Sequence, residues 1–332
     1  MKPLIKALVE TAAPSGYEKQ LRELIHREIK DSVEELKVDA MGNLIARKKA
    51  LPQGRRLMLA AHIDEIGIMV THVDEDGFAR FTNIGGVFPR NCVGAHVRFI
   101  NGAMGVIGIE REDNRQAVPP LEKMYIDTGA ANRAACPVKT GDVGVFDRPF
   151  LDLGKRLVSK AMDDRIGVVV LIETCRQLKE SPYDVYFVFS AQEEVGTRGA
   201  IPAAYGIDPQ LGLAVDVTHT GDTPKGIKMD VALGKGAAIK VRDSGMLADP
   251  RVVEWMADTA QKHRIPYQLE VLEAGSTDAR SIQVSRAGVP SGCLSIPARY
   301  IHTPSEMVDI DDVQAAVNLL LALLSQDVPL PE

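Results

Sequence analysis

The sequence predicts an α/β protein: a mainly parallel, mixed sheet flanked by helices, with a small all-β domain inserted into it. Two observations lead to this prediction. Apolar runs at residues 57–63 and 185–191 alternate with helical periodicity, and runs that are apolar on both faces are typical of buried parallel strands. Between about residues 70 and 150, short alternating segments are broken by turn pairs such as Asp76-Gly77 and Gly141-Asp142, a pattern that indicates an all-β unit.

Each element follows from its local pattern. Residues 3–30 have the periodicity of an amphipathic helix interrupted near Pro14, and Ser15 is expected to cap a second helix that begins near Tyr17. The same criteria predict strands at 57–63, 157–162, 185–191, 211–217, 268–272 and 292–296, and helices at 165–179, 250–263 and 309–325. The α/β domain is therefore expected to comprise residues 1–69 and 153–332, with residues 70–152 as the inserted β domain.

The composition is that of a globular protein and argues against nucleic-acid-binding and membrane-spanning proteins. Hydrophobic residues make up 45% of the 332, charged residues 25%, and the net charge is -6, which are ordinary globular values. A mildly acidic chain without a basic stripe argues against nucleic-acid binding. The N-terminus lacks a secretion signal, and the apolar stretch 313–324 is too short and too polar to span a bilayer. We expect a soluble, cytoplasmic protein without membrane partners.

Acidic and histidine side chains lie at or just after five predicted strands, where active sites of open α/β sheets gather. Alone, a histidine at a strand end is usually a hydrogen-bonding residue, and an acidic pair is usually a helix cap or a solvated charge. Their coincidence at five strand ends favours a metal site. The candidates are His62 with Asp64, Asp163 with Asp164, Glu193 with Glu194, Asp216, and His302.

The ligand types indicate the metal chemistry. Imidazole and carboxylate ligands suit zinc, cobalt or manganese. Two divalent ions, three carboxylates and one bridging hydroxide balance in charge, and such a hydroxide is the nucleophile of dinuclear hydrolases. Only one of two adjacent side chains can face a metal while the chain is extended. A turn near Gly196 is therefore expected, with one of Glu193 and Glu194 binding metal and the other accepting a proton.

The segments AAHIDEIGIMV, KAMDDRIG, AQEEVGTRGA, AVDVTHTGD, GSTDARSIQ and IPARYIHTPSE occur in this order, and the set resembles the tetrahedral dinuclear-zinc aminopeptidases. These co-catalytic zinc exopeptidases include glutamyl, leucyl and deblocking aminopeptidases, and some members carry an old endoglucanase label. The resemblance extends through the insert, which ends in the family-like GDVGVFDRPF.

The resemblance implies an enzyme that removes the N-terminal residue from short peptides with a water or hydroxide bridging two metal ions. It implies that Asp163 bridges the metals, that Asp64 orients His62, and that Glu193 is the general base. It implies four further metal ligands, namely His62, Glu194, Asp216 and His302. It also implies a tetrahedral assembly of twelve subunits, with the inserted domain contributing to oligomerisation.

One motif departs from the family pattern. The family usually has Gly-Gly-Thr-Asp where this chain has Gly275-Ser276-Thr277-Asp278, and Arg280 stands where a small residue is common. Because this stretch is expected near the substrate pocket, Thr277, Asp278 and Arg280 are candidate substrate-binding residues. Arg280 can equally be an ordinary charge on a helix surface.

Three alternatives fit less well. A related zinc carboxypeptidase, dipeptidase or deacylase is disfavoured by the β-rich insert. A glycosidase needs two carboxylates facing each other about 5–9.5 Å apart, whereas the acids here cluster with histidines, and aromatic residues are only 5% of the chain. A non-enzymatic scaffold would usually have lost some of the ligands. The sequence leaves the cellular metal and the preferred N-terminal residue open.

Overall fold

The structure is a computed structural model that describes residues 1–49, 54–111 and 118–327. Among these residues, eleven strands form one mixed sheet, and its centre has the order β12-β3-β13-β16 with all neighbours parallel. Antiparallel pairs extend the sheet on both sides of this centre, and β14 and β15 form one further parallel pair beside β16. The strands are β1 (Glu35–Val38), β2 (Leu44–Lys48), β3 (Arg55–His62), β10 (Leu151–Leu153), β11 (Arg156–Ser159), β12 (Tyr183–Ser190), β13 (Leu211–Thr218), β14 (Ala237–Arg242), β15 (Tyr267–Val271), β16 (Ser291–Arg299) and β17 (Glu306–Asp309).

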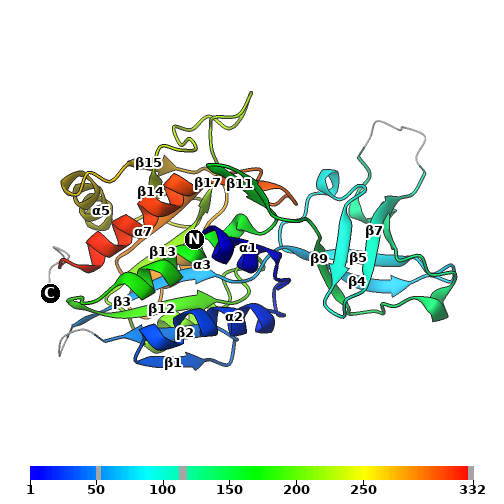
Figure 1. The fold of residues 1–332 in the computed structure, drawn as a ribbon, viewed down its shortest axis with the longest axis horizontal. Coiled ribbons are helices and arrows are strands. Elements are labelled where there is room, and N and C mark those ends of the chain that lie inside the picture. The colour runs from blue at the N-terminus through cyan, green and yellow to red at the C-terminus, as the bar shows by residue number, and fades with distance from the viewer. Residues whose placement is uncertain (50–53, 112–117, 328–332) are drawn as a thin grey trace.

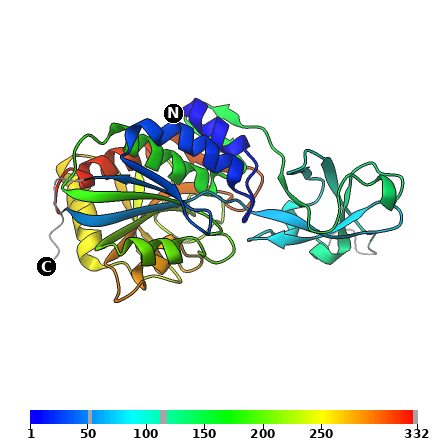
Figure 2. The ribbon, with the colours of Figure 1, turned by 90° about the horizontal axis from the view of Figure 1, so that it is seen from below.

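Helices cover both faces of the sheet (Figure 2). One face packs against α1 (Lys2–Glu10), α2 (Lys19–Ile29), α3 (Met162–Gln177), α5 (Pro250–Lys262) and α7 (Ile310–Leu324). The other face packs against α4 (Ala200–Ile207) and α6 (Asp278–Gln283). Short 3-10 turns lie at η1 (Lys30–Ser32), η2 (Pro89–Asn91), η3 (Leu121–Lys123) and η4 (Arg133–Ala135). The predicted α/β class, with a mixed sheet flanked by helices, is confirmed.

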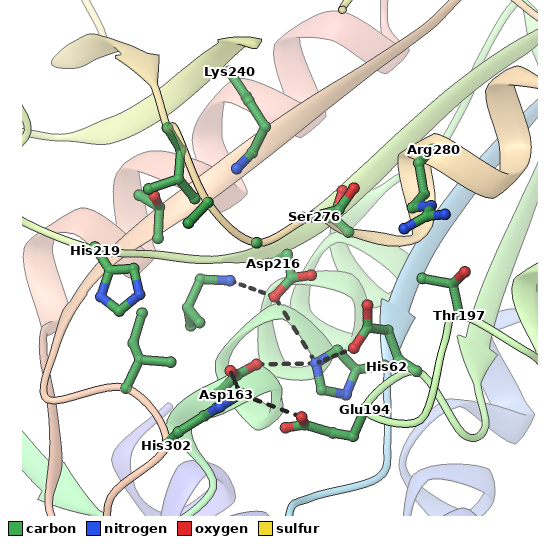
Figure 3. A pocket seen from close by; sticks show the side chains of 18 of the residues that line it. His62, Asp163, Glu194, Thr197, Asp216, His219, Lys240, Ser276, Arg280 and His302 are labelled. Carbon is green, nitrogen blue, oxygen red and sulfur yellow. Dashed lines mark hydrogen bonds and ion pairs between the residues drawn. The ribbon is translucent and has the colours of Figure 1, made fainter. Parts of the chain in front are cut away.

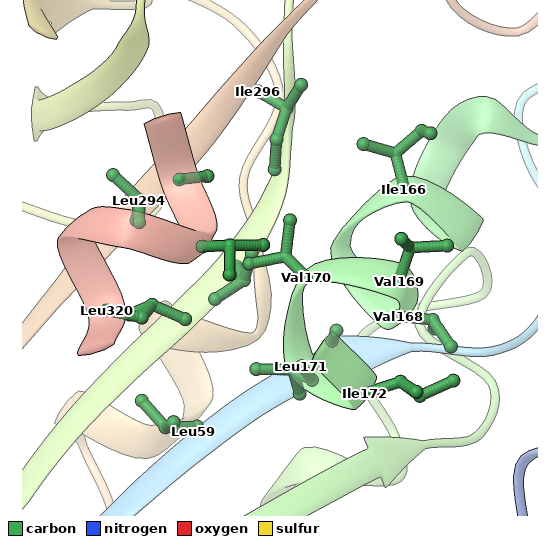
Figure 4. Close-up of a cluster of buried hydrophobic side chains, with 14 of the residues drawn as sticks. Leu59, Ile166, Val168, Val169, Val170, Leu171, Ile172, Leu294, Ile296 and Leu320 are labelled. Atoms are coloured by element: carbon green, nitrogen blue, oxygen red, sulfur yellow. The ribbon is translucent and has the colours of Figure 1, made fainter. Parts of the chain in front are cut away.

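The main core lies between α3, α7 and the sheet. Apolar side chains of α3 such as Val170 and Leu171 face Leu59 of β3, Ile296 of β16 and Leu320 of α7 (Figure 4). Burying one such side chain contributes about 1.5–3 kcal/mol. Strand β3 is apolar from residue 57 to residue 61 because residues 57, 59 and 61 join this core, while residues 58 and 60 join the core under α4 and α6.

A closed barrel projects from one end of the α/β body (Figure 1). Its strands are antiparallel, run in the order β4-β5-β8-β7-β6-β9, and enclose a separate apolar core. They are β4 (Gly67–Val73), β5 (Ala79–Ile84), β6 (His96–Phe99), β7 (Met104–Ile109), β8 (Met124–Asp127) and β9 (Val143–Phe146). The all-β insert is confirmed as this barrel. Its boundaries at residues 70 and 152 stay a prediction, and residues 112–117 of the predicted insert lie outside the described residues.

Some local expectations are wrong. Ser15 does not cap α2: Glu18 stands at the N-cap without a capping bond, and the Ser15 hydroxyl instead donates to Asp64 Oδ2 at 2.6 Å. The strand expected at 157–162 ends at Ser159 and is antiparallel to its neighbours, because the following residues already lead into α3. The pattern also missed the strands β1, β2, β10, β14 and β17 and the helices α4 and α6. No helix in the described part of the chain is both long and apolar enough to cross a membrane.

Candidate active site and metal centre

His62 and Asp64 lie at the carboxyl end of β3, in the middle of the parallel part of the sheet. Both side chains are buried, and His62 Nδ1 lies 3.4 Å from Asp64 Oδ1. The backbone amides of Glu193 and Glu194 also donate to Asp64, at 2.9 and 3.1 Å. One carboxylate thus contacts the imidazole and at the same time holds the turn that carries both glutamates.

Asp163 lies between the two histidines (Figure 3). Its Oδ1 is 2.9 Å from His62 Nε2, and its Oδ2 is 3.4 Å from His302 Nε2. Asp216 Oδ1, from β13, lies 3.9 Å from His62 Nε2, and Glu194 Oε2 lies 3.2 Å from His302 Nε2. The five predicted ligands therefore form two groups that share Asp163. We call them the His62 half-site, with Asp216, and the His302 half-site, with Glu194.

A sharp turn after β12 presents the two glutamates. Gln192 and Thr197 have φ angles of 57° and 51°, and Gly196 has a φ of 117°, a conformation that favours glycine. Both glutamates line the same pocket as a result. Glu193 Oε2 lies 3.9 Å from His62 Nε2, while Glu194 contacts His302. The turn expected from Gly196 is observed, and it gives the two carboxylates different partners.

The protonation of the site reflects crowded carboxylates. Burial lowers the pKa of His62, but contacts with Asp163 and Asp64 outweigh it and place the pKa well above its ordinary value. Burial also lowers the pKa of His302. Contacts with Asp163 and Glu194 outweigh this effect and raise the pKa of His302 to about 11. Burial raises the pKa of Asp216 well above its usual range, and the charge of Asp163 raises it further. The site therefore favours bound positive charge.

The donor set fits divalent cations. Ligand atoms of His62, Asp163 and Glu194 all lie within 4.8 Å of one another, and so do those of His62, Asp164 and Asp216. Mixed imidazole and carboxylate donors suit zinc, cobalt and manganese. Asp164 accepts hydrogen bonds from the amides of His62 and Gly167 at 3.2 and 3.0 Å, so this carboxylate already fastens the start of α3 to β3.

The half-sites open into a pocket of about 460 Å³. Arg280 of α6 lines it (Figure 3). Thr277, at the N-cap of α6, and Phe88 of the barrel line it as well. Arg280 forms no ion pair among the described residues, so its guanidinium is available to a ligand. Asp278 is not among the lining residues. It is buried behind the wall, where it accepts a hydrogen bond from Ser190, and burial raises its pKa to about 6.

The structure adds residues that the sequence did not single out. Lys240, buried on β14, lines the pocket and lies 2.6 Å from Glu270. Its signal was a lysine within an apolar run, which requires a buried partner. His219 also lines the pocket, and burial lowers its pKa. Phe88 had no sequence signal, because its position depends on how the barrel meets the body.

Comparison with known proteins identifies relatives over nearly the whole chain. The family model of M42 glutamyl aminopeptidases matches residues 42–319. A putative aminopeptidase of Acetivibrio thermocellus is 45% identical over 97% of both chains. The lysyl aminopeptidase of Pyrococcus furiosus is 36% identical over 98% of this chain and 97% of its own.

Solved structures of similar chains share the whole fold. An aminopeptidase from the archaeon Desulfurococcus kamchatkensis superposes with a TM-score of 0.94 at 40% identity, covering 98% of this chain and 95% of its own. The TET1 peptidase of Pyrococcus horikoshii superposes with a TM-score of 0.88 at 33% identity, covering 98% and 99%. That peptidase is described as assembling into a tetrahedron or a large octahedral shell.

Proposed function

The chain belongs to the family of M42 glutamyl aminopeptidases and is thus a metallo-aminopeptidase. We propose that it removes the N-terminal residue from short peptides, with the residues of the site in the following roles. His62, Asp163, Glu194, Asp216 and His302 hold two divalent ions, zinc or alternatively cobalt or manganese. The observation that carries this proposal is the position of Asp163, whose two oxygens face different histidines at 2.9 and 3.4 Å.

When bound, the two ions acidify a water molecule and polarise the scissile carbonyl. The chain's own residues supply orientation and proton transfer. Asp64 contacts His62 Nδ1 and fixes the imidazole so that Nε2 points to the ions. Glu193 accepts the proton from the attacking water and delivers it to the leaving amine, because its carboxylate is in the pocket without a direct contact to His302 or Asp163.

The general-base role also agrees with the charge around Glu193. Burial raises the pKa of Glu193 well above its ordinary value, and the nearby carboxylates of Asp216 and Asp278 raise it further. A carboxylate in such surroundings accepts a proton more readily than one in water, as a general base near neutral pH requires.

Arg280 supports a preference for acidic N-terminal side chains. Within residues 1–49, 54–111 and 118–327 its guanidinium forms no ion pair, whereas Lys240, also in the pocket wall, is already engaged by Glu270. Guanidinium groups bind carboxylates through strong charge-assisted hydrogen bonds. The relatives differ in preference, since one is named lysyl and another, from Lactococcus lactis, glutamyl. The residues of this pocket must therefore decide the preference.

We also propose that the chain forms a homo-oligomer, most simply a tetrahedral dodecamer in which the barrel contributes contacts. The support is its similarity to the tetrahedral Pyrococcus horikoshii peptidase over 98% of the chain. Light scattering of the metal-loaded protein is expected to give twelve times 36.0 kDa. A monomer under every metal condition would contradict the assembly.

The catalytic proposal is tested with a panel of chromogenic aminoacyl substrates. The enzyme is assayed with zinc, cobalt and manganese, and after exhaustive chelation. We expect cleavage of substrates with a free amine, none of their N-acetylated forms, and loss of activity on chelation that added metal restores. Full activity in chelator, with no metal detected by elemental analysis, would rule out the dinuclear site.

A further inference from the structure

His302 has a backbone conformation that must be held by its surroundings. Its φ is 61°, in the left-handed region, which is unfavourable for a residue other than glycine. It lies in the segment after β16, where no regular element supports it. Its ring nevertheless approaches Glu194 and Asp163 at 3.2 and 3.4 Å. Contacts from other elements must therefore fix this residue.

Hydrogen bonds hold both peptide groups of His302. On one side, Glu306 of β17 is buried, and its Oε1 accepts from the His302 amide at 2.8 Å while its Oε2 accepts from the Asp163 amide at 2.9 Å. On the other side, Asn91 Nδ2 donates to the His302 carbonyl at 3.1 Å. Glu306 belongs to the α/β body, whereas Asn91 ends the η2 turn between barrel strands β5 and β6.

The barrel also contacts the imidazole ring directly. A Cβ atom on Gly86 would lie 2.3 Å from His302 Nδ1, closer than two such atoms can approach. The φ of Gly86 is outside the left-handed region, so glycine is required here by space and not by conformation. The neighbouring Gly85 lies against Glu194, since its Cβ would be 3.1 Å from that of Glu194. The barrel backbone thus forms one wall of the His302 half-site.

We propose that Asn91 and Gly86 of the barrel are positioning residues that set the metal affinity of the His302 half-site. This rests on the proposed function, in which His302 is a metal ligand. Asn91 fixes the carbonyl of the left-handed residue, and Gly86 limits the rotation of its ring. Removing a group that orients a metal ligand typically weakens metal binding about 10–100-fold. The barrel then completes the metal centre, in addition to any role in assembly.

The test is a zinc titration of the metal-free, full-length protein, followed by calorimetry or by competition with a chelating dye. Asn91→Asp keeps the shape of the side chain and removes its donor. We expect the affinity for one of the two ions to fall about 10–100-fold, with the other ion changed less than about threefold. At saturating zinc, kcat should return to near the wild-type value with KM unchanged, which a general loss of structure would not permit.

Gly86→Ala provides an independent variant, and it should weaken the same ion at least as much. Two matched controls should bind both ions like the wild type. Asn101→Asp removes a similar donor, from Asn101 Nδ2 to the Pro137 carbonyl at 3.0 Å, at an exposed barrel position that does not line the active-site pocket. Gly206→Ala adds a methyl group in α4, where a Cβ would meet nothing within 4 Å.

His302→Ala separates this proposal from the function it rests on. Weakened zinc binding in His302→Ala, but wild-type binding in both Asn91→Asp and Gly86→Ala, would overturn the positioning role and leave the metal site intact. Wild-type zinc binding in His302→Ala would remove His302 from the ligands, and the positioning proposal with it. A lower melting temperature with unchanged zinc affinities would also overturn the proposal, because it indicates a structural contact alone.

Discussion

The two half-sites use the same ligand types but are held in different ways. The His62 side chain is 2% exposed and sits at the end of a central parallel strand. The His302 side chain is 26% exposed and sits in a left-handed segment held by Glu306 and by the barrel. Regular sheet geometry positions the first histidine, whereas contacts between distant segments position the second. The difference indicates that the His302 half-site is the more easily perturbed.

The largest expected effect separates the roles of the adjacent glutamates. Glu193→Gln keeps the side-chain shape but cannot accept a proton, so kcat should fall at least about 10²-fold with metal content unchanged. Glu194→Gln removes the charge that contacts His302, so metal content should fall together with the rate. Elemental analysis and steady-state kinetics on both variants check this. Metal loss in Glu193→Gln and retention in Glu194→Gln would mean that the roles are exchanged.

The second effect concerns the more deeply buried half-site. Asp64→Asn removes the carboxylate that faces His62 Nδ1 and that holds both glutamate amides. We expect affinity for at least one ion to fall about 10–100-fold, measured by zinc titration of the metal-free protein. If the rigid setting of β3 alone is enough to orient His62, the affinities will stay at the wild-type values. The contrast between the half-sites would then be larger still, because the strand alone would orient His62.

The same contrast explains how much the sequence could predict. His62 and Asp216 belong to apolar strands whose parallel pairing follows from their pattern, so their meeting at one edge could be expected. Ser15 shows where prediction from local sequence fails. The local pattern predicted that Ser15 caps a helix, but its hydroxyl donates a hydrogen bond to Asp64, which is distant in the sequence. Asn91 and Gly86 lie in another unit altogether. Their contacts with His302 depend on how the barrel docks, for which a single sequence contains no periodic signal.

The next prediction concerns Arg280 and the substrate pocket beside the two half-sites. If its guanidinium pairs with an acidic N-terminal side chain, Arg280→Ala should raise KM for glutamyl substrates about tenfold, which corresponds to about 1.4 kcal/mol, and leave leucyl substrates near the wild-type values. Arg251→Ala is the matched control, because Arg251 lies at an exposed position of α5 outside the pocket, and its ion pair among the described residues is with Asp249. Equal glutamyl and leucyl preferences in the wild type and in Arg280→Ala would make Arg280 an ordinary surface charge.

The smallest effect on rate is expected for Ser15→Ala, on the outer side of the His62 half-site. Ser15 donates to Asp64 Oδ2 at 2.6 Å in a buried setting, and hydrogen bonds to charged groups contribute about 1.5–3 kcal/mol. Asp64 keeps its two backbone donors, so the carboxylate stays in place and kcat should fall less than about tenfold. The free energy of unfolding, measured with urea, should fall by about 1.5–3 kcal/mol. Ser325→Ala is the control, since Ser325 donates to the neutral Leu321 carbonyl at an exposed position. A loss of rate as large as that of Asp64→Asn would show that Ser15, and not the strand geometry alone, determines where Asp64 stands.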